Sequence, residues 1–418
     1  MLTGLFPVLW ETPFLNQITG LVELGHEVDI YADHPQPGVP AHPDIERLAL
    51  LERTRYPARL SGSARERWLE AVRLIQAHRG ADRTALLRTL NPRMFWARAW
   101  SLDQLRRTLP FLPRRTYDVT YCPFAQDGRR SLRLRRLGVL AGKLVVALRG
   151  SDFSRYLAQR GKQVYQRLFQ EADLLLPVCQ AYSERLRRLG CDPRKIVVHH
   201  TGINLSRFPF RPRQRPERIL RLITVGRLVE KKGITYALQS IRQLGRAGVE
   251  VTYEIVGDGP LQSELEREVG QLGLSSRVRF TGIQTQSQVQ EALDRADVML
   301  APCVTARDGD EEGIPNVLRE GMAAGLPVIS SYHSGIPELV EDGVSGLLVP
   351  ERDPGAIAER VRRLADQPEI WHPMVTAARS RIEQDDIQWL NQRFVSLLER
   401  LVGAGPESAL PVRVPAPV

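Results

Sequence analysis

The sequence predicts an α/β protein built from two doubly wound parallel sheets, and three observations support this fold class. The chain has 418 residues, which exceeds one ordinary core and suits two domains of about 200 residues each. Short β-branched runs alternate with helical patterns in both halves, as in sheets whose strands are joined by crossover helices. A proline-rich stretch without periodicity separates the halves.

The first half, residues 1–207, is expected to form the N-terminal domain. Its predicted strands are 27–32, 118–122, 144–148, 174–178 and 195–199. Residues 45–115 form an insertion with helical patterns and little strand propensity. Residues 1–4 are too few for a complete first strand, so we expect either a truncated strand or a misassigned start.

The segment 208–218 contains three prolines and is predicted to be the interdomain linker. The second domain is expected over 219–384, with strands at 221–225, 251–256, 278–281, 298–302, 327–330 and 346–349. A further helix is expected over 385–402. Residues 403–418 are rich in Pro, Ala and Val, and we expect them to be disordered.

The composition is typical of a soluble cytoplasmic protein, with 43% hydrophobic and 25% charged residues. No apolar run approaches the roughly 20 residues that span a bilayer, and the start lacks the features of a signal peptide. Four scattered cysteines without a C-x-x-C pair argue against a zinc site or a disulfide framework, and they suit a reducing compartment.

The positive charge is concentrated in one stretch. Residues 52–115 hold 15 Arg and 5 acidic residues, so 15 − 5 = +10 accounts for the whole formal net charge of +10. The aromatic residues interleaved with these arginines are Trp68, Phe95, Trp96, Trp100 and Phe111. Arginine with tryptophan on helices favours contact with an anionic membrane surface. The alternatives are a plain solvated surface and nucleic acid, for which no recognition motif is present.

The most informative stretch is 308–350, where Glu312 and Glu320 lie eight positions apart. Glu312 precedes a turn, and Glu320 lies inside a helix predicted to begin near residue 316. The free N–H groups of a helix N-terminus attract anions, and the two carboxylates could accept hydrogen bonds from the hydroxyls of an elongated ligand. The residues of the turn and the helix start are Gly313, Ile314, Pro315 and Asn316.

A glycine followed by basic residues comes after the first predicted strand of the second half. Gly226 permits a tight turn and a close approach of the backbone to a ligand. Arg227 offers a fork of donors and Lys232 a mobile charge, both suited to a diphosphate. Lys231 is the rival for the lysine role, although the spacing favours Lys232.

These motifs resemble the donor-binding signatures of the retaining glycosyltransferases of family 4. Glu312 and Glu320 fill the E-x7-E motif, and Arg227 with Lys232 fills G-R-x4-K. The resemblance implies a GT-B fold, in which two Rossmann-like domains face a cleft and the last helix crosses back to the first domain. It also implies that Arg227 and Lys232 hold the diphosphate, that Glu312 takes part in catalysis and that Glu320 binds the ribose hydroxyls.

Two weaker matches belong to the same side of the cleft. The resemblance implies that Gly257, after a predicted strand, lies near the nucleotide. It also implies that the backbone of the segment ending at Ile283 contacts the edge of the base. The resemblance covers about residues 5–400. Within the family, the sequence is most similar to exopolysaccharide and colanic-acid-type enzymes. Their acceptors are saccharides or polyprenyl-diphosphate-linked saccharides, which would place this enzyme on the inner face of the plasma membrane.

The first half carries the motifs expected to face the acceptor. Glu11 and Thr12 match an F-P-x-x-S-E-T segment of the exopolysaccharide enzymes. Arg149 stands where many relatives have His, and because Arg cannot be deprotonated it acts only as a fixed cation. Asp152, which completes the R-G-S-D sequence, is a candidate acceptor or sugar contact.

No metal or other cofactor is expected, because the basic residues supply the positive charge that a divalent ion would otherwise bring. Asp308 and Asp310 match D-x-D only superficially, and we interpret them as an acidic acceptor-side loop. His199 and His200 are adjacent on a predicted strand and so point to opposite faces. Two other functions stay open, a nucleotide-sugar epimerase and a non-catalytic sugar-nucleotide-binding scaffold.

Overall fold

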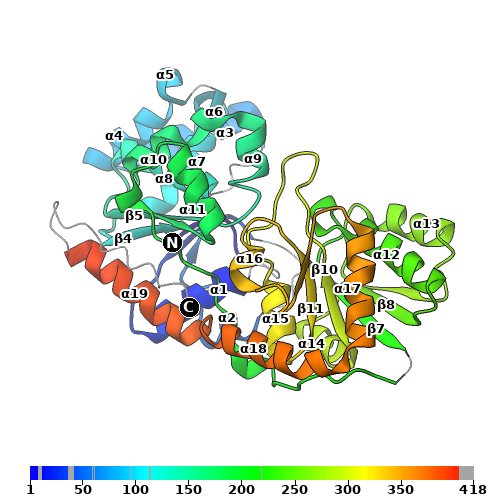
Figure 1. Ribbon diagram of the computed structural model, residues 1–418. Helices are drawn as coiled ribbons and strands as arrows, with labels where there is room; N and C mark the ends of the chain where they lie inside the picture. Colours follow the sequence, from blue (N-terminus) through cyan, green and yellow to red (C-terminus); the bar gives the residue numbers. More distant parts are fainter. Residues whose placement is uncertain are drawn as a thin grey trace.

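The computed structural model contains two α/β domains and a C-terminal helix that returns to the first of them (Figure 1). It describes residues 1–7, 12–35, 42–58, 60, 62–95, 97–112, 114–217 and 219–403. Glu11, Trp96, the last linker residue and the tail from 404 onward lie outside the described residues, as does the side chain of Thr12.

The described residues of the first domain form six strands in two parallel three-stranded sheets, and β1 of one contacts β4 of the other. The strands are β1 (Leu2–Leu5), β2 (Ile30–His34), β3 (Thr54–Arg55), β4 (Val119–Cys122), β5 (Lys143–Leu148) and β6 (Leu174–Pro177). The helices are α1 (Thr12–Glu23), α2 (Pro43–Arg47), α3 (Ala64–Ala77), α4 (Gly80–Thr89), α5 (Pro92–Phe95), α6 (Ala97–Trp100), α7 (Asp103–Thr108), α8 (Ala125–Leu137), α9 (Arg155–Arg160), α10 (Gln166–Glu171) and α11 (Gln180–Arg188).

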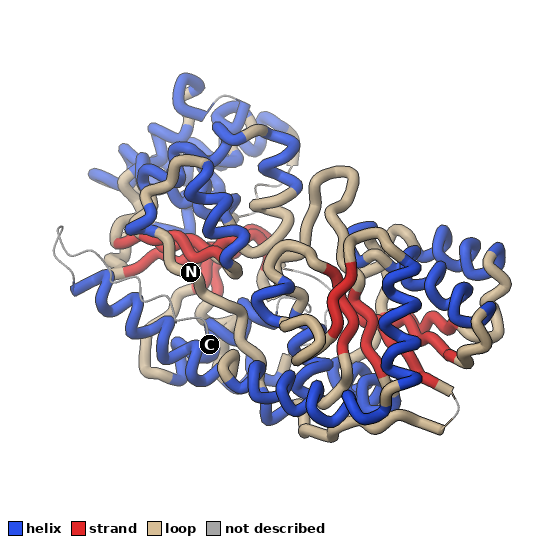
Figure 2. The backbone as a smooth tube through the Cα atoms, viewed as in Figure 1, coloured by secondary structure: helices blue, strands red, loops and turns tan. Residues whose placement is uncertain are grey.

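The second domain is one parallel six-stranded sheet of order β12-β11-β10-β7-β8-β9, with helices on both faces (Figure 2). Its strands are β7 (Leu220–Val225), β8 (Val251–Val256), β9 (Val278–Gly282), β10 (Val298–Ala301), β11 (Val328–Ser331) and β12 (Leu347–Val349). The helices are α12 (Ile234–Arg246), α13 (Gln262–Gln271), α14 (Gln286–Arg295), α15 (Asn316–Ala324), α16 (Ile336–Leu339), α17 (Pro354–Asp366) and α18 (Trp371–Glu383). The C-terminal helix that returns to the first domain is α19 (Ile387–Gly403).

The predicted fold class is confirmed, and two local predictions in the first domain are corrected. Residues 2–5 form a short strand that pairs in parallel with β2, which agrees with the expectation of a truncated first strand. The insertion contains the short strand β3, which adds to the same sheet. Residues 195–199 form no regular strand, yet the N–H groups of Val197 and His199 donate to carbonyls of β6.

Two chain segments connect the domains, and they are hydrogen-bonded to each other. Ile203, before the first crossing, forms a parallel bridge with Asp386, at the second. The linker runs along the surface of the second domain, where the Arg211 N–H donates to the Ala324 carbonyl. Beyond the second crossing, α19 packs on α1, and Asn391 Nδ2 donates to the Asn16 carbonyl at 3.1 Å.

Candidate active site

Two glycine turns bring the ends of β7 and β8 into contact. Gly226 has φ 152° and Gly257 has φ 132°, which other residues rarely adopt. A Cβ on Gly257 would lie 2.0 Å from the Gly226 carbonyl oxygen, and one on Gly226 would lie 3.2 Å from Cε of Lys232. Any side chain here would fill the space beside Lys232, so glycine keeps this edge of the sheet open to a ligand.

Glu312 lies against two lysines. Its Oε1 is 3.0 Å from Nζ of Lys232 and 3.2 Å from Nζ of Lys231, and Lys231 also pairs with Asp310 at 3.3 Å. Burial opposes ionisation, yet the two lysines lower the pKa of Glu312 to about 2. Burial acts against the charge of Lys232 as well, but Glu312 raises its pKa. The structure therefore brings together Glu312, the predicted Lys232 and its rival Lys231.

Arg227 is not part of this cluster. Its side chain is exposed, and within the described ranges it forms no ion pair or side-chain hydrogen bond. Ile283, at the end of β9, is 63% exposed. Both residues adjoin the strand ends on which the site is built, at the C-terminal edge of the parallel sheet, where open α/β sheets bind ligands.

Glu320 is on α15, and its surroundings differ from those of Glu312. Its carboxylate has no hydrogen-bond or ion-pair partner in the described part of the chain, and burial raises its pKa to about 7. It lines a cavity of about 130 Å³ between the domains. The other lining residues are Asn16, Gly202, Ile203, Asn204, Arg207, Phe208, Gln286, Asn316 and Arg319.

The turn from Glu312 to Asn316 is held from two sides. The Glu312 N–H donates to Nε2 of His333 at 3.1 Å, and Nδ1 of His333 contacts Glu351 Oε1 at 2.6 Å. His333 is 2% exposed. The Nδ1–H of His333 donates to Glu351, which leaves Nε2 without a proton and able to accept from the Glu312 N–H. Glu351 thus fixes the tautomer of His333 that binds the turn. The turn then leads into α15, whose N-cap Pro315 provides no side-chain cap.

Sequence analysis did not identify His333 or Glu351. His333 lies within the stretch 308–350 that the sequence analysis singled out, but its pairing with Glu312 joins residues 21 positions apart. A signal was available, because both residues follow strands that end at the same edge of the sheet. A polar residue at such a position is a candidate for the site.

The first domain contacts this turn through the residues that follow β5 and β6. A Cβ on Gly313 would lie 2.8 Å from Val178 and 3.5 Å from the Arg149 carbonyl oxygen, so only glycine fits between the domains here. The Arg149 guanidinium donates to Tyr121 Oη at 2.8 Å and to Gln17. Ile314 packs against buried residues of both domains.

The prediction that Asp152 contacts the acceptor is not supported by its position. Asp152 is 4% exposed, and its two oxygens accept from the N–H groups of Ala125 at 2.7 Å and Gly150 at 3.0 Å. Burial raises its pKa to about 6. Asp152 thus shapes the loop that carries Arg149 and satisfies the first turn of α8, in place of facing a ligand.

The acidic loop reaches across to the first domain. Asp308 lies 3.5 Å from Arg155, and Glu311 lies 2.6 Å from Arg185. Asp310 accepts from Ser154 Oγ at 3.1 Å in addition to its pairing with Lys231. These carboxylates are neutralised by cations of both domains. Among the residues the structure describes, no three His, Cys, Asp or Glu side chains could hold a metal ion together.

The adjacent histidines face different surroundings. The His199 ring lies 5.1 Å from that of Phe394, and burial, with Arg149 nearby, lowers its pKa to about 3. His200 lies 3.6 Å from both Asp385 and Glu338. Burial opposes its charge, but these carboxylates raise its pKa.

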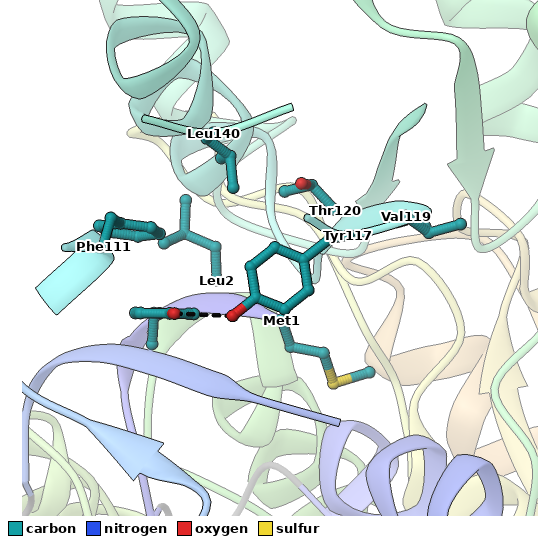
Figure 3. Close-up of a pocket in the computed structure, with 8 residues that line it drawn as sticks. Met1, Leu2, Phe111, Tyr117, Val119, Thr120 and Leu140 are labelled. Atoms are coloured by element: carbon teal, nitrogen blue, oxygen red, sulfur yellow. Dashed lines mark hydrogen bonds between the residues drawn. The ribbon is translucent and has the colours of Figure 1, made fainter. Parts of the chain in front are cut away.

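A second cavity lies far from these residues, between β1 and β4. It is lined by Met1, Leu2, Tyr31, Phe111, Tyr117, Val119, Thr120 and Leu140 (Figure 3). The Tyr117 hydroxyl lies 2.8 Å from that of Tyr31. At about 10 Å³ the cavity is no larger than one water molecule requires. It therefore cannot take a substrate.

Comparisons with known proteins match both halves of the chain. The family model described as Glycosyltransferase Family 4 matches residues 11–207, and that described as Glycosyl transferases group 1 matches 220–367. The putative colanic acid biosynthesis glycosyltransferase WcaL of Salmonella typhimurium is 38% identical over 407 residues, covering 95% of this chain and 98% of that protein. The amylovoran biosynthesis glycosyltransferase AmsK of Erwinia amylovora is 35% identical over 410 residues, with the same coverage.

A solved structure extends the likeness to the fold. Anabaena Alr3699/HepE, determined in complex with UDP and glucose, has a TM-score of 0.66 at 17% identity, covering 95% of this chain and 98% of that one. The shared architecture is the GT-B fold.

Proposed function

The chain belongs to the group 1 glycosyltransferases of family 4, and from that premise we propose that it transfers a hexosyl unit from a nucleoside-diphosphate sugar with retention of configuration. The observation that carries this proposal is the pair of motif glutamates. Glu312 is held by two lysines, while Glu320 is unpartnered, within the described residues, in a cavity between the domains. An elongated donor could place its diphosphate at the lysines beside Glu312 and its ribose at Glu320.

In the proposed reaction, the bond between the sugar and the diphosphate breaks, and negative charge develops on the leaving phosphate. Arg227 and Lys232 hold the two phosphates, and their charge stabilises that leaving group. Glu312 orients the lysines toward the sugar end. The leaving phosphate itself assists deprotonation of the acceptor hydroxyl, on the face where the new bond forms.

We further propose that the acceptor is a saccharide or a polyprenyl-diphosphate-linked saccharide of exopolysaccharide biosynthesis. Two relatives support this assignment, the putative colanic acid biosynthesis glycosyltransferase WcaL and the amylovoran biosynthesis glycosyltransferase AmsK.

Labelled UDP- and GDP-hexoses test the reaction. A transferase releases nucleoside diphosphate slowly by hydrolysis even without acceptor, and it forms a product whose anomeric configuration NMR can assign. An epimerase would change the sugar without releasing the nucleotide, and a scaffold would bind the donor unchanged. Either of those two results overturns the proposal.

We also propose that the enzyme works in the cytoplasm, peripherally on the anionic inner face of the plasma membrane. No helix of the described residues is both long and apolar enough to cross a bilayer. The insertion carries exposed apolar side chains among its exposed arginines, namely Leu69, Val72, Leu87, Met94 and Trp100. Phe95 and Phe111 belong to the core instead and cannot contribute.

Co-sedimentation with vesicles tests this attachment. Each Arg near an anionic surface contributes about 1 kcal/mol, screened over roughly 8–10 Å. Changing Arg65, Arg73 and Arg98 to Glu should abolish low-salt binding to anionic vesicles. The matched control changes Arg246, Arg267 and Arg279 of the second domain to Glu and should retain binding. If the wild-type protein ignores anionic vesicles at low salt, the insertion is only a solvated surface.

A further inference from the structure

Lys231 is surrounded by oxygens of three consecutive residues. Its Nζ lies 3.3 Å from the Asp310 carboxylate, 3.4 Å from the Glu311 carbonyl and 3.2 Å from Glu312 Oε1. The Lys231 side chain is only 16% exposed. An ammonium group has three N–H donors, so these three oxygens can satisfy it completely. Lys231 therefore uses its donors within the protein.

Lys232 differs from its neighbour in this respect. Among the described residues, Glu312 Oε1, at 3.0 Å, is the one oxygen paired with its Nζ. A Cβ on Gly226 would lie 3.7 Å from that Nζ, so the glycine leaves room for a ligand beside it. The contacts therefore favour Lys232 as the phosphate ligand and leave a different role for Lys231.

Asp310 connects Lys231 to the first domain. Ser154 is 3% exposed, and its Oγ lies 3.1 Å from Asp310 Oδ1 and 3.2 Å from the Gly150 carbonyl. The single hydroxyl proton has both acceptors within reach, and the charged carboxylate is the stronger one. The same Oγ accepts from the Glu311 N–H at 3.2 Å. One buried serine of the first domain thus contacts the acidic loop twice.

Ser154 is fixed within the segment that follows β5. Its N–H donates to the Gly150 carbonyl at 3.0 Å, and the Gly150 N–H donates to Asp152 at 3.0 Å. The same segment begins with Arg149. When the first domain moves relative to the second, Ser154 moves with it, and its distance to Asp310 changes.

A continuous series of contacts therefore crosses between the domains. It runs from Ser154 through Asp310 and Lys231 to Glu312, and each contact is 3.3 Å or shorter. Figure 1 shows the loop between β10 and α15, which carries Asp310 and Glu312, extending toward the first domain. The position of a donor-site carboxylate thus depends on a serine of the acceptor-side domain.

We propose that Lys231 is a positioning residue, which holds Glu312 in place when Ser154 of the first domain lies against Asp310. Glu312 in turn orients Lys232 toward the leaving phosphate, so this role rests on the proposed function. If the domains separate, Asp310 loses Ser154, and Lys231 is held on one side only. The donor site is then complete only after the first domain has closed on it, which limits cleavage of the donor while water has access.

A double-mutant cycle between Ser154 and Lys231 tests this connection in the full chain. The readouts are kcat and KM for the labelled UDP- or GDP-hexose that the wild-type enzyme hydrolyses. Lys231→Met should lower kcat about tenfold and change KM less than about threefold, because Arg227 and Lys232 still hold the phosphates. Ser154→Ala should lower kcat about threefold in the wild-type background and cause no further loss beside Lys231→Met. The two side chains belong to different domains, so such coupling points to Asp310 between them.

Arg155→Met is the matched control. Arg155 pairs with Asp308 of the same loop at 3.5 Å, so it joins the same two domains without a contact to Lys231 among the described residues. Its effect on kcat should be small and equal with and without Lys231→Met. Lys231→Arg keeps the charge and should retain part of the rate, and it replaces Lys231→Met if that variant does not fold.

Three results would overturn the positioning role. The first is a pair of independent effects, in which Ser154→Ala lowers kcat equally with and without Lys231→Met. The second is a rise in KM without a loss of kcat, which would make Lys231 a donor ligand. The third is a change confined to Tm.

The wild-type activity separates this role from the proposed function. A wild-type chain that hydrolyses none of the donors overturns glycosyl transfer, and the positioning role with it. An active wild-type chain in which Ser154 and Lys231 act independently overturns the positioning role alone.

Discussion

The two ends of the donor site contain the same residue in opposite electrostatic settings. Glu312 has two lysines within 3.2 Å, and its pKa falls to about 2. Glu320, eight positions later, has no partner in the described structure, and its pKa rises to about 7. One carboxylate is ionised at any physiological pH, while the other titrates near neutrality. The motif specifies two glutamates, but the residues facing each one determine what it can do.

The largest expected effect tests whether the Glu312 end holds the diphosphate. Arg227→Ala or Lys232→Ala removes charge-assisted hydrogen bonds worth roughly 1.5–3 kcal/mol. Transfer activity should fall at least tenfold, since about 1.4 kcal/mol is one decade. The exposed Lys162→Ala is the matched control. Activity within twofold of wild type in both site variants would sink the assignment.

Exchanging each glutamate for glutamine tests whether Glu312 and Glu320 have different roles. Glu312→Gln should lower kcat about tenfold, because the lysines lose the carboxylate that positions them against the leaving phosphate. Glu320→Gln should mainly weaken nucleotide binding, because it removes an acceptor for the ribose hydroxyls. Steady-state kinetics together with titration of the nucleoside diphosphate separate the two effects. Identical patterns in both variants would contradict the division of roles.

Removal of the His333 acceptor tests how the Glu312 end is positioned. His333→Phe leaves the buried Glu312 N–H without a partner, at a cost of about 1–3 kcal/mol. We expect kcat to fall about tenfold while the donor Kd changes less than threefold, and His333→Gln should restore part of the rate. Tyr332→Phe removes one hydrogen bond from the neighbouring exposed residue and should have no effect. A change confined to Tm would indicate a purely structural role.

The pH dependence should come from the Glu320 end. Hydroxyl groups of a ligand prefer the ionised carboxylate, so nucleotide affinity should rise with pH through about 7 and fall severalfold between pH 7.5 and 6.5. Glu320→Gln should flatten this profile. The raised pKa also has a consequence for folding. The Glu320 carboxylate binds a proton more tightly in the folded state than in the unfolded state. Its contribution to the free energy of unfolding is therefore lost as pH rises from about 4.5 to 7. For Glu312 the sign is opposite, with stability lost as pH falls from about 4.5 toward 2.

The smallest expected effect is none at all. EDTA should leave transfer activity unchanged, because the basic residues at the Glu312 end replace a divalent ion. An activity that disappears with EDTA and returns only with Mg²⁺ or Mn²⁺ would revive a metal role for Asp308 and Asp310.

The sequence predicted the fold and the donor motifs because both are encoded in short stretches of chain. Strands of the second domain are short runs rich in β-branched and other apolar residues that alternate with helical patterns. Glu312 and Glu320 are separated by a single turn and part of one helix. Contacts between distant segments could not be read in this way. His333 meets the turn from 21 positions away, and Lys231 meets Glu312 through a geometry that spacing does not reveal.

Asp152 shows the opposite error. A polar residue in a glycine-containing loop beside the cleft resembles a ligand contact, but its oxygens satisfy backbone N–H groups that the sequence does not display as needing a partner. The sequence left two expectations open for the first strand for a related reason. Four residues suffice for β1 because β2 supplies its pairing partner, and that partner is 29 positions away.

The pairing of the two interdomain crossings limits how the cleft can change shape. A single flexible connection would allow one domain to rotate about all three axes relative to the other. Here the Ile203 N–H donates to the Asp385 carbonyl, and the Ile387 N–H donates to the Ile203 carbonyl, at 3.0 and 2.9 Å, so the crossings are fastened side by side. This pairing restricts rotation of one domain about the linker more than a single connection would. Any closing motion is then expected to keep Gly313 opposite the Arg149 carbonyl, where the structure places it.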